Sequence, residues 1–236
     1  MTDAEQPQDG PTGHEFDQPY WEEHWRRTPG SGARQAVPAN PYVVAETGQL
    51  APGTALDAGC GEGAEAIWLA SQGWQVTAAD ISSSALATAA ARADESGLAG
   101  RITWVEADLT TWEPGRLLDL VTTSYAHPAM PQLAFYDRVA DWVAPGGTLL
   151  VVGHLHGPGH GPGHGSGHGS GHGSGHGSGH GHPPAEATVS LASITDRLDP
   201  RTWEVVTAEE HARSVTTPGG RQVPLHDVVV RATRRA

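Results

Sequence analysis

The sequence has a single cysteine, Cys60, in 236 residues. One thiol cannot form an internal disulfide framework, so the reducing cytoplasm is the expected location. Residues 1–13 are acidic and rich in proline, glutamine and glycine, and they lack the basic segment and apolar run of a secretion signal. No other stretch approaches the roughly 18 continuous apolar residues of a transmembrane helix. We therefore expect a cytoplasmic protein without a membrane span.

Basic residues are also scarce. The chain has 14 lysines and arginines against 27 aspartates and glutamates, which gives a formal net charge of −13. Affinity for nucleic acid depends heavily on basic side chains that neutralise phosphates. We therefore expect no nucleic-acid partner.

Glycine, in contrast, is concentrated at one informative point. Gly59, Gly61 and Gly63 follow the apolar strand predicted over 54–58. Closely spaced glycines indicate a tight turn that approaches a ligand, because a Cβ would block the backbone. Apolar residues at helical spacing over 63–72 predict that a helix follows, with its N-terminal amides toward the ligand. The pattern indicates a site for a cofactor that contains a nucleoside.

Two classes of cofactor fit this turn. A dinucleotide fingerprint, G-x-G-x-x-A, begins at Gly59, and Asp80 stands at the spacing expected for the acid that binds a ribose. Asp57, however, would repel a pyrophosphate but tolerate the ammonium group of an amino-acid-like ligand. Asp108, at the end of the alternating segment 101–107, can accept a hydrogen bond from an adenine amino group. These acids favour an adenosine cofactor with an amino-acid tail, and a nicotinamide dinucleotide is the alternative.

The predicted elements alternate along the chain. Helices are expected at 17–27, 63–72, 83–95, 131–142 and 190–198, and strands at 54–58, 75–80, 101–107, 118–124, 147–153, 203–206 and 225–231. Alternating strands and helices predict an α/β fold with a doubly wound, mostly parallel sheet. The last two strands are expected to form an antiparallel pair around a turn at Pro218-Gly219-Gly220. Such sheets bind ligands at the carboxyl ends of their strands, where Asp80, Asp108 and Ser124 fall.

Five segments between Asp57 and His154 carry a family resemblance: DAGCGEG, VTAADIS, WVEADL, LLDLVTTSYAHP and APGGTLLVVGH, in this order. With these motifs the chain resembles the class I S-adenosylmethionine-dependent methyltransferases over residues 42 to 153. The resemblance implies a Rossmann-like, mostly parallel seven-stranded sheet with an antiparallel closing strand pair, and S-adenosylmethionine as the cofactor. The segments GCGEGAEAIWLA and QGWQVTAADIS look closest to the small-molecule branch that includes the tellurite and thiopurine methyltransferases. A small-molecule methyl acceptor is therefore expected.

The resemblance also implies which positions hold the cofactor. The methionine end is assigned to Asp57, Gly59, Gly61 and Gly63, the ribose hydroxyls to Asp80, and the adenine to Ile81, Asp108 and Leu109. Ser124 and Tyr125 are expected to line the transfer site at the end of the fourth strand. Residues 124–128, Ser-Tyr-Ala-His-Pro, differ from the Asn-Pro-Pro-aromatic signature of the DNA and RNA amino-group methyltransferases. This difference again disfavours nucleic acid.

Two residues after the fourth strand are candidates for catalysis. Methyl transfer is an in-line displacement on an activated carbon, so positioning of the two reactants supplies much of the catalysis. An acceptor that carries a proton would also use a base. His127 is the candidate base, and Tyr125 is the second candidate, expected to orient the acceptor.

A low-complexity tract follows the fifth strand. Its histidines recur every four residues between glycine, serine and proline, at His160, His164, His168, His172, His176 and His180. Glycine at alternate positions disfavours a helix, so we expect a disordered insertion over 154–185. Its imidazoles would chelate divalent Ni, Cu, Zn or Co. A physiological metal role is one interpretation, and neutral expansion of a repeat in a surface loop is the other.

One domain with tails accommodates these features. We expect a disordered tail over 1–15, an N-terminal helical lid over 16–45, the cofactor-binding core over 46–153, the insertion, and a C-terminal helix with the closing strand pair over 186–236. A small-molecule methyltransferase is the leading interpretation. A metal-sequestering protein on a methyltransferase-like scaffold and a nicotinamide-dependent oxidoreductase are the alternatives. The acceptor atom and the oligomeric state are left open.

Overall fold

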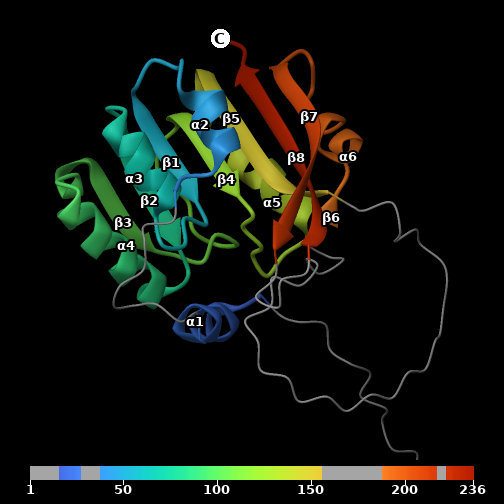
Figure 1. The fold of residues 1–236 in the computed structure, drawn as a ribbon. Helices are drawn as coiled ribbons and strands as arrows, with labels where there is room; N and C mark the ends of the chain where they lie inside the picture. Colours follow the sequence, from blue (N-terminus) through green and yellow to red (C-terminus); the bar gives the residue numbers. More distant parts are fainter. Residues whose placement is uncertain (1–15, 28–37, 156–187, 217–221) are drawn as a thin grey trace, which may run out of the picture.

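The computed structural model describes residues 16–27, 38–155, 188–216 and 222–236, which build one mixed β-sheet (Figure 1). The strand order is β3-β2-β1-β4-β5-β8-β7. The first five strands are parallel to one another: β1 (Thr54–Ala58), β2 (Gln75–Asp80), β3 (Ile102–Glu106), β4 (Leu118–Ser124) and β5 (Val143–Leu155). β8 (Gln222–Arg234) runs antiparallel to β5 and to the edge strand β7 (Trp203–Thr216). A two-residue strand, β6 (Thr188–Val189), pairs with the end of β5 beside this seven-stranded path.

Helices cover both faces of the sheet. α2 (Pro41–Thr47), α3 (Ala64–Ser71) and α4 (Ser83–Glu95) lie on one face, and α5 (Gln132–Asp141) and α6 (Leu191–Thr195) lie on the other (Figure 1). Each face has its own apolar core, with Val43 and Leu69 on the first and Phe135 and Ile194 on the second. The arrangement confirms the predicted Rossmann-like, doubly wound α/β fold with an antiparallel closing pair. α1 (Gln18–Arg27) precedes this core, and a short 3-10 helix, Ala99–Arg101, precedes β3.

The closing strand pair is longer than predicted. β7 extends to Thr216 and β8 begins at Gln222, whereas the expected ranges were 203–206 and 225–231. The sequence prediction relied on apolar residues, and β7 carries exposed acids such as Glu209 because it is the edge strand. The ladder to β8 continues regardless, since backbone groups make its hydrogen bonds.

The segment before β1 contains a helix, α2, that the sequence prediction omitted. The side chain of Asn40 accepts a hydrogen bond from the Tyr42 amide at 2.9 Å, and Pro41 occupies the first turn. An asparagine cap followed by proline is typical of a helix start. Only Val43 and Thr47 are buried in this helix, so its apolar periodicity is too short to predict an element.

Several predicted features lie outside the described residues: the tail over 1–15, the turn at Pro218-Gly219-Gly220 and the six histidines from His160 to His180. His154 and Leu155, which the prediction assigned to the insertion, belong to β5. Of the helices in the described ranges, none combines the length and the apolar character needed to cross a membrane.

Candidate active site

The glycine turn connects β1 to α3 at the carboxyl end of the sheet. Gly59 has a φ of +82°, and a Cβ there would lie 2.3 Å from the Cβ of Ala126 in the loop after β4. Gly61 has a φ of +50°, and a Cβ there would lie 2.8 Å from the ring of Trp25 in α1. Both positions therefore require glycine, because neither the backbone angle nor the space admits a side chain.

Asp80 ties this turn to the end of β2. Its Oδ2 accepts a hydrogen bond from the Gly61 amide at 2.8 Å, and its Oδ1 accepts one from the Ser82 amide at 2.9 Å. The Gly59 amide also donates to the carbonyl of Ala79 at 2.8 Å. Burial raises the pKa of Asp80, although the amide donors oppose that rise. Each carboxylate oxygen retains a further acceptor position, so Asp80 can hold the turn and still accept from a ligand hydroxyl.

Asp57 is buried at the end of β1 without full hydrogen bonding. The residue is 1% exposed, and its Oδ2 has no hydrogen-bond partner among the described residues; Ser124 Oγ at the end of β4 has none there either. Burial, and then the charges of Glu65 and Asp80, raise the pKa of Asp57 well above its ordinary value. An unpaired buried carboxylate oxygen is costly. A ligand with an ammonium group would satisfy it, so this strand end fits the methionine end of S-adenosylmethionine.

The predicted adenine residues follow β2 and β3. Ile81 is half-buried, and Asp108 is exposed. The Oδ1 of Asp108 accepts hydrogen bonds from the amide and hydroxyl of Thr110 at 2.9 and 2.7 Å, so it caps the turn after β3. Leu109 is buried, and its carbonyl accepts a hydrogen bond from Arg138 Nε at 3.0 Å. Contact between these residues and an adenine stays a prediction.

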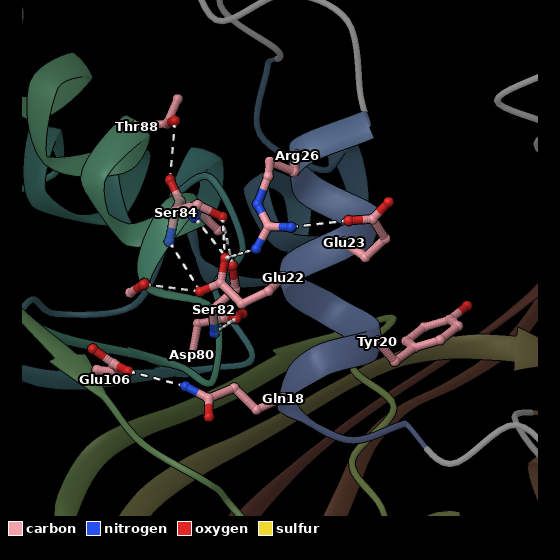
Figure 2. A network of polar contacts seen from close by, with 12 residues as sticks. Gln18, Tyr20, Glu22, Glu23, Arg26, Asp80, Ser82, Ser84, Thr88 and Glu106 are labelled. Atoms are coloured by element: carbon pink, nitrogen blue, oxygen red, sulfur yellow. Dashed lines mark hydrogen bonds and ion pairs between the residues drawn. The ribbon is translucent and has the colours of Figure 1, made fainter.

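α1 lies over the carboxyl ends of β2 and β3 (Figure 2). Glu22 accepts hydrogen bonds from the Ser83 hydroxyl at 2.8 Å and from the Ser84 hydroxyl at 2.6 Å, at the start of α4. These bonds, with that of Ser84 the strongest influence, lower the pKa of Glu22 to about 2. Gln18 Nε2 donates to Glu106 Oε1 at 3.2 Å, at the end of β3. One helix thus contacts α4 and β3 as well as the glycine turn.

The loop after β4 carries the two predicted catalytic residues. Tyr125 has a φ of +54°, which is rare for a residue other than glycine and common at functional sites. His127 is buried, with its Nδ1 3.1 Å from Gln132 Oε1. Gln132 Nε2 donates to the Ala126 carbonyl at 2.9 Å, which assigns Oε1 as the acceptor and His127 Nδ1 as the donor. Burial lowers the pKa of His127 to about 4, so its ring is neutral at pH 7 with Nε2 unprotonated.

Three further side chains, those of His154, Arg213 and Asp227, meet beside this loop, and the sequence prediction placed none of them in the site. Asp227 of β8 is fully buried, and its Oδ2 accepts hydrogen bonds from Arg213 Nε at 2.5 Å and from the Tyr42 hydroxyl at 3.5 Å. His154 of β5 stacks on Tyr125 with ring centroids 4.5 Å apart, and its Nδ1 lies 3.8 Å from Asp227 Oδ1. Burial alone would raise the pKa of Asp227, but His154 and Arg213 outweigh it and hold that pKa below its ordinary value.

One signal for this cluster was present in the sequence. Asp227 is a lone acid directly before the apolar run Val228-Val229-Val230, and a buried acid normally has a partner. Its partner is not encoded locally, because the antiparallel register of β5 and β8 sets His154 opposite Asp227.

The described residues contain no group of three or more possible metal ligands. The predicted ligands from His160 to His180 lie outside that part of the chain. Metal binding by the tract therefore stays a prediction.

Comparison with known proteins agrees with this arrangement. Residues 55–147 match a family model described as a methyltransferase domain. The chain is 32% identical to thiocyanate methyltransferase 1 of Arabidopsis thaliana over 148 residues, which cover 58% of this chain and 64% of the relative. It is 35% identical to ribosomal RNA small subunit methyltransferase C of Alcanivorax borkumensis over 106 residues, which cover 43% of this chain and 32% of the relative. A structure of magnesium protoporphyrin IX methyltransferase from Synechocystis covers 95% of this chain and 100% of that one, with a TM-score of 0.60 at 18% identity.

The glycine turn and strands β2 to β4 lie within residues 55–147, the part of the chain that matches the methyltransferase-domain model. In its ordered motifs, its fold and its relatives, the chain is similar to the class I S-adenosylmethionine-dependent methyltransferases. It spans less than two thirds of the length of the two curated relatives. These comparisons lend no support to the oxidoreductase and metal-sequestering alternatives.

Proposed function

We propose that this protein transfers a methyl group from S-adenosylmethionine to a small-molecule acceptor. The observation that carries the proposal is the buried carboxylate of Asp57, whose Oδ2 has no hydrogen-bond partner in the described part of the chain, directly before a turn that requires glycine at Gly59 and Gly61. A ligand that brings an ammonium group close to the backbone would satisfy both features. The likeness to S-adenosylmethionine-dependent methyltransferases supports the same cofactor.

In this proposal each strand end contacts a different part of the cofactor. Asp57 would accept from the ammonium group, Asp80 from the ribose hydroxyls, and Asp108 from the adenine amino group. Ile81 and Leu109 would pack against the adenine ring. When bound, S-adenosylmethionine supplies an electrophilic methyl group on its sulfonium sulfur.

The acceptor would lie beside Tyr125 and His127. Aromatic side chains from the N-terminal segment close this region: the Phe16 ring lies 5.8 Å from that of His127, and Trp21 Nε1 donates to the His127 carbonyl at 3.2 Å. Such an enclosure excludes water and favours a small acceptor over a nucleic-acid strand. The net charge of −13 points the same way. Because one relative is named as a ribosomal RNA methyltransferase, RNA is the acceptor to test against.

Calorimetric titration of S-adenosylmethionine and S-adenosylhomocysteine into the full chain tests the cofactor. We expect dissociation constants in the micromolar range, and Asp57→Ala should weaken binding at least about tenfold, or about 1.4 kcal/mol. Asp94→Ala is the matched control, because Asp94 is an exposed acid near the end of α4. Failure of the folded wild-type protein to bind either ligand would refute the proposal.

Methyl labelling then tests the acceptor class. The full chain is incubated with methyl-labelled S-adenosylmethionine and either ribosomal RNA or a set of thiols, phenols, amines and pseudohalide ions. Label in a small-molecule product supports the proposal. Label in the RNA instead would replace the small molecule with RNA as acceptor.

A further inference from the structure

His154 and Asp227 form an incompletely bonded pair in the interior. His154 Nδ1 is buried, has no hydrogen-bond partner within the described ranges, and lies 3.8 Å from Oδ1 of the fully buried Asp227 carboxylate. That separation is too long for a hydrogen bond but lies within ion-pair distance. A protonated His154 ring would therefore face a negative charge without any large rearrangement.

This pair lies next to the predicted transfer site. The Tyr125 amide donates to the carbonyl two residues before His154 at 2.9 Å, which brings the ends of β4 and β5 together. The His154 ring stacks on Tyr125, and the next residue, Ala126, borders Gly59 of the cofactor turn. The ring centroids of His127 and His154 are 5.7 Å apart. His154 therefore lies on the acceptor side of the glycine turn.

We propose that His154 is the general base of the methyl-transfer reaction, that Asp227 positions it, and that the acceptor is a neutral molecule bearing a proton on sulfur, oxygen or nitrogen. This inference rests on the proposed function. Asp227 is itself fixed by Arg213 of β7 and Tyr42 of α2. Side chains from two other elements thus hold the carboxylate that faces the imidazole.

The two residues predicted from the sequence are less suited to remove a proton. His127 commits Nδ1 to Gln132, and its pKa of about 4 makes its Nε2 a weak base. Burial, followed by the charge of Asp227, raises the pKa of Tyr125, so its phenol keeps its proton at neutral pH. Both residues remain placed to orient the acceptor.

The charges that face His154 are matched in the resting site. The titratable groups around it are those of Asp227, Arg213, Tyr42, Tyr125 and His127, and only the first two are charged. The negative charge of Asp227 and the positive charge of Arg213 form an ion pair at 2.5 Å, and both tyrosines are neutral because burial raises their pKa. An anionic acceptor would therefore compete with Asp227 for Arg213, whereas a neutral acceptor would not.

The proposed step is balanced in atoms and electrons. The lone pair of the acceptor atom forms a bond to the methyl carbon while the carbon–sulfur bond breaks, and the electron pair of that bond stays on sulfur. The acceptor's proton passes to His154 Nε2, and the hydrogen on Nδ1 then donates to Asp227. The products are the methylated acceptor, a neutral thioether and an imidazolium, which returns its proton to water.

The tautomer of His154 tests the pairing without any substrate. Long-range proton–nitrogen NMR spectra of the full chain, assigned through His154→Gln, should show His154 with its hydrogen on Nδ1. Asp227→Asn should move the hydrogen to Nε2, because an amide nitrogen would then donate to Nδ1. A tautomer that does not respond to Asp227→Asn would overturn the pairing.

Activity measurements with two acceptors distinguish a general base at His154 from a residue with only a structural role. 2-Mercaptoethanol is neutral and carries a proton, whereas thiocyanate is an anion that has none to lose. His154→Gln should lower kcat/KM for the thiol about 100-fold and leave that for thiocyanate unchanged. His226→Gln is the matched control, because His226 lies next to Asp227 on the other face of β8. Equal losses with both acceptors, or none with either, would overturn the assignment.

Failure of the assignment and failure of the proposed function are distinguishable. If the wild-type chain binds no S-adenosylmethionine in the calorimeter, the proposed function is refuted. If wild type and His154→Gln bind it equally but the tautomer is insensitive to Asp227→Asn, only the role of His154 is refuted, whether or not either probe is methylated.

Discussion

The carboxylate of Asp57 costs the ligand-free protein stability, because it is buried with one oxygen unpaired among the described residues. Burial and the charges of Glu65 and Asp80 raise its pKa. The folded protein therefore holds the Asp57 proton more strongly than the unfolded chain does. The stability that this proton confers is present at acidic pH and is lost as the pH rises from the ordinary aspartate range through the raised value.

Asp57→Asn should remove this cost and weaken cofactor binding at the same time. We expect the free energy of unfolding of the ligand-free protein at pH 7 to rise by about 1–3 kcal/mol, with a smaller gain below about pH 4. Affinity for S-adenosylmethionine should fall at least about tenfold. Urea unfolding at both pH values measures the first effect and calorimetry the second. A less stable variant at pH 7 would contradict the expectation.

Gly59→Ala should lower the stability of the protein by more than the strain of its backbone angle alone would. Gly97 is the matched control, because its φ is +68° but an added Cβ would meet nothing within 4 Å. Gly97→Ala should cost about 1–2 kcal/mol, whereas Gly59→Ala should cost more and weaken cofactor binding, since its Cβ would lie 2.3 Å from that of Ala126. Thermal unfolding and calorimetry measure both. Adding Ala126→Gly should recover part of the loss, and equal costs at the two glycines would rule out the steric argument.

Residues that are neighbours in the sequence were the ones that could be predicted. The run from Asp57 to Gly63 shows its turn directly, because glycine spacing is a local signal. Asp80 also accepts a hydrogen bond from the Gly61 amide. This contact could not be predicted from the sequence, because it forms only where the ends of β1 and β2 meet. The His154–Asp227 pair depends in the same way on the register between β5 and β8, which are neighbours in the sheet but far apart in the sequence.

At the level of elements, Glu22 joins α1 to the start of α4. Hydrogen bonds from Ser84 and Ser83 lower its pKa from 4.5 to about 2. A carboxyl group with a lowered pKa stabilises the contact above its ordinary pKa, and this stabilisation is lost as the pH falls from 4.5 to about 2. The contact is therefore complete at neutral pH.

Glu22→Gln should loosen α1 without unfolding the sheet. We expect hydrogen exchange in residues 18–27 to accelerate at pH 7, because an amide is a weaker acceptor for the two serine hydroxyls than a carboxylate. Exchange in β1 and β4 should not change. Glu23→Gln is the matched control, since that carboxylate pairs with Arg26 at 2.9 Å. Equal acceleration in the two variants would show that Glu22 has no special role.

The predicted elements with clear periodicity have nearly the observed limits. β1, β2, β4 and α4 were expected over 54–58, 75–80, 118–124 and 83–95, and they begin and end at those residues. α2 and the length of β7 were not predicted, because neither has a clear apolar pattern: α2 buries only two residues, and β7 is a polar edge strand. Local capping at Asn40 and backbone pairing to β8 decide these elements instead.

For the whole molecule, residues 156–187 should be dispensable for the cofactor site. β6 runs parallel to the end of β5, with His154 opposite Thr188, so the chain positions that flank this segment are close together. A flexible linker of about eight residues can join them. We expect the shortened chain to keep its Tm within about 4 °C and to bind S-adenosylmethionine and transfer methyl groups as before, while Ni²⁺ binding falls. Calorimetry with both ligands and the labelling assay decide this, and loss of turnover would revive the metal interpretation.

The attachment of α1 at separate points has a consequence for the timing of the reaction cycle. Glu22 bonds α4, Gln18 bonds the end of β3, and Trp21 bonds the loop after β4. A spent cofactor beneath this helix would leave only when all three bonds open together, so product release should be slower than chemistry. Rapid mixing should then show a burst of methylated product before the steady state, and Glu22→Gln should quicken the steady state but not the burst. A time course that is linear from the start would mean that α1 opens quickly and that methyl transfer, not product release, limits the rate.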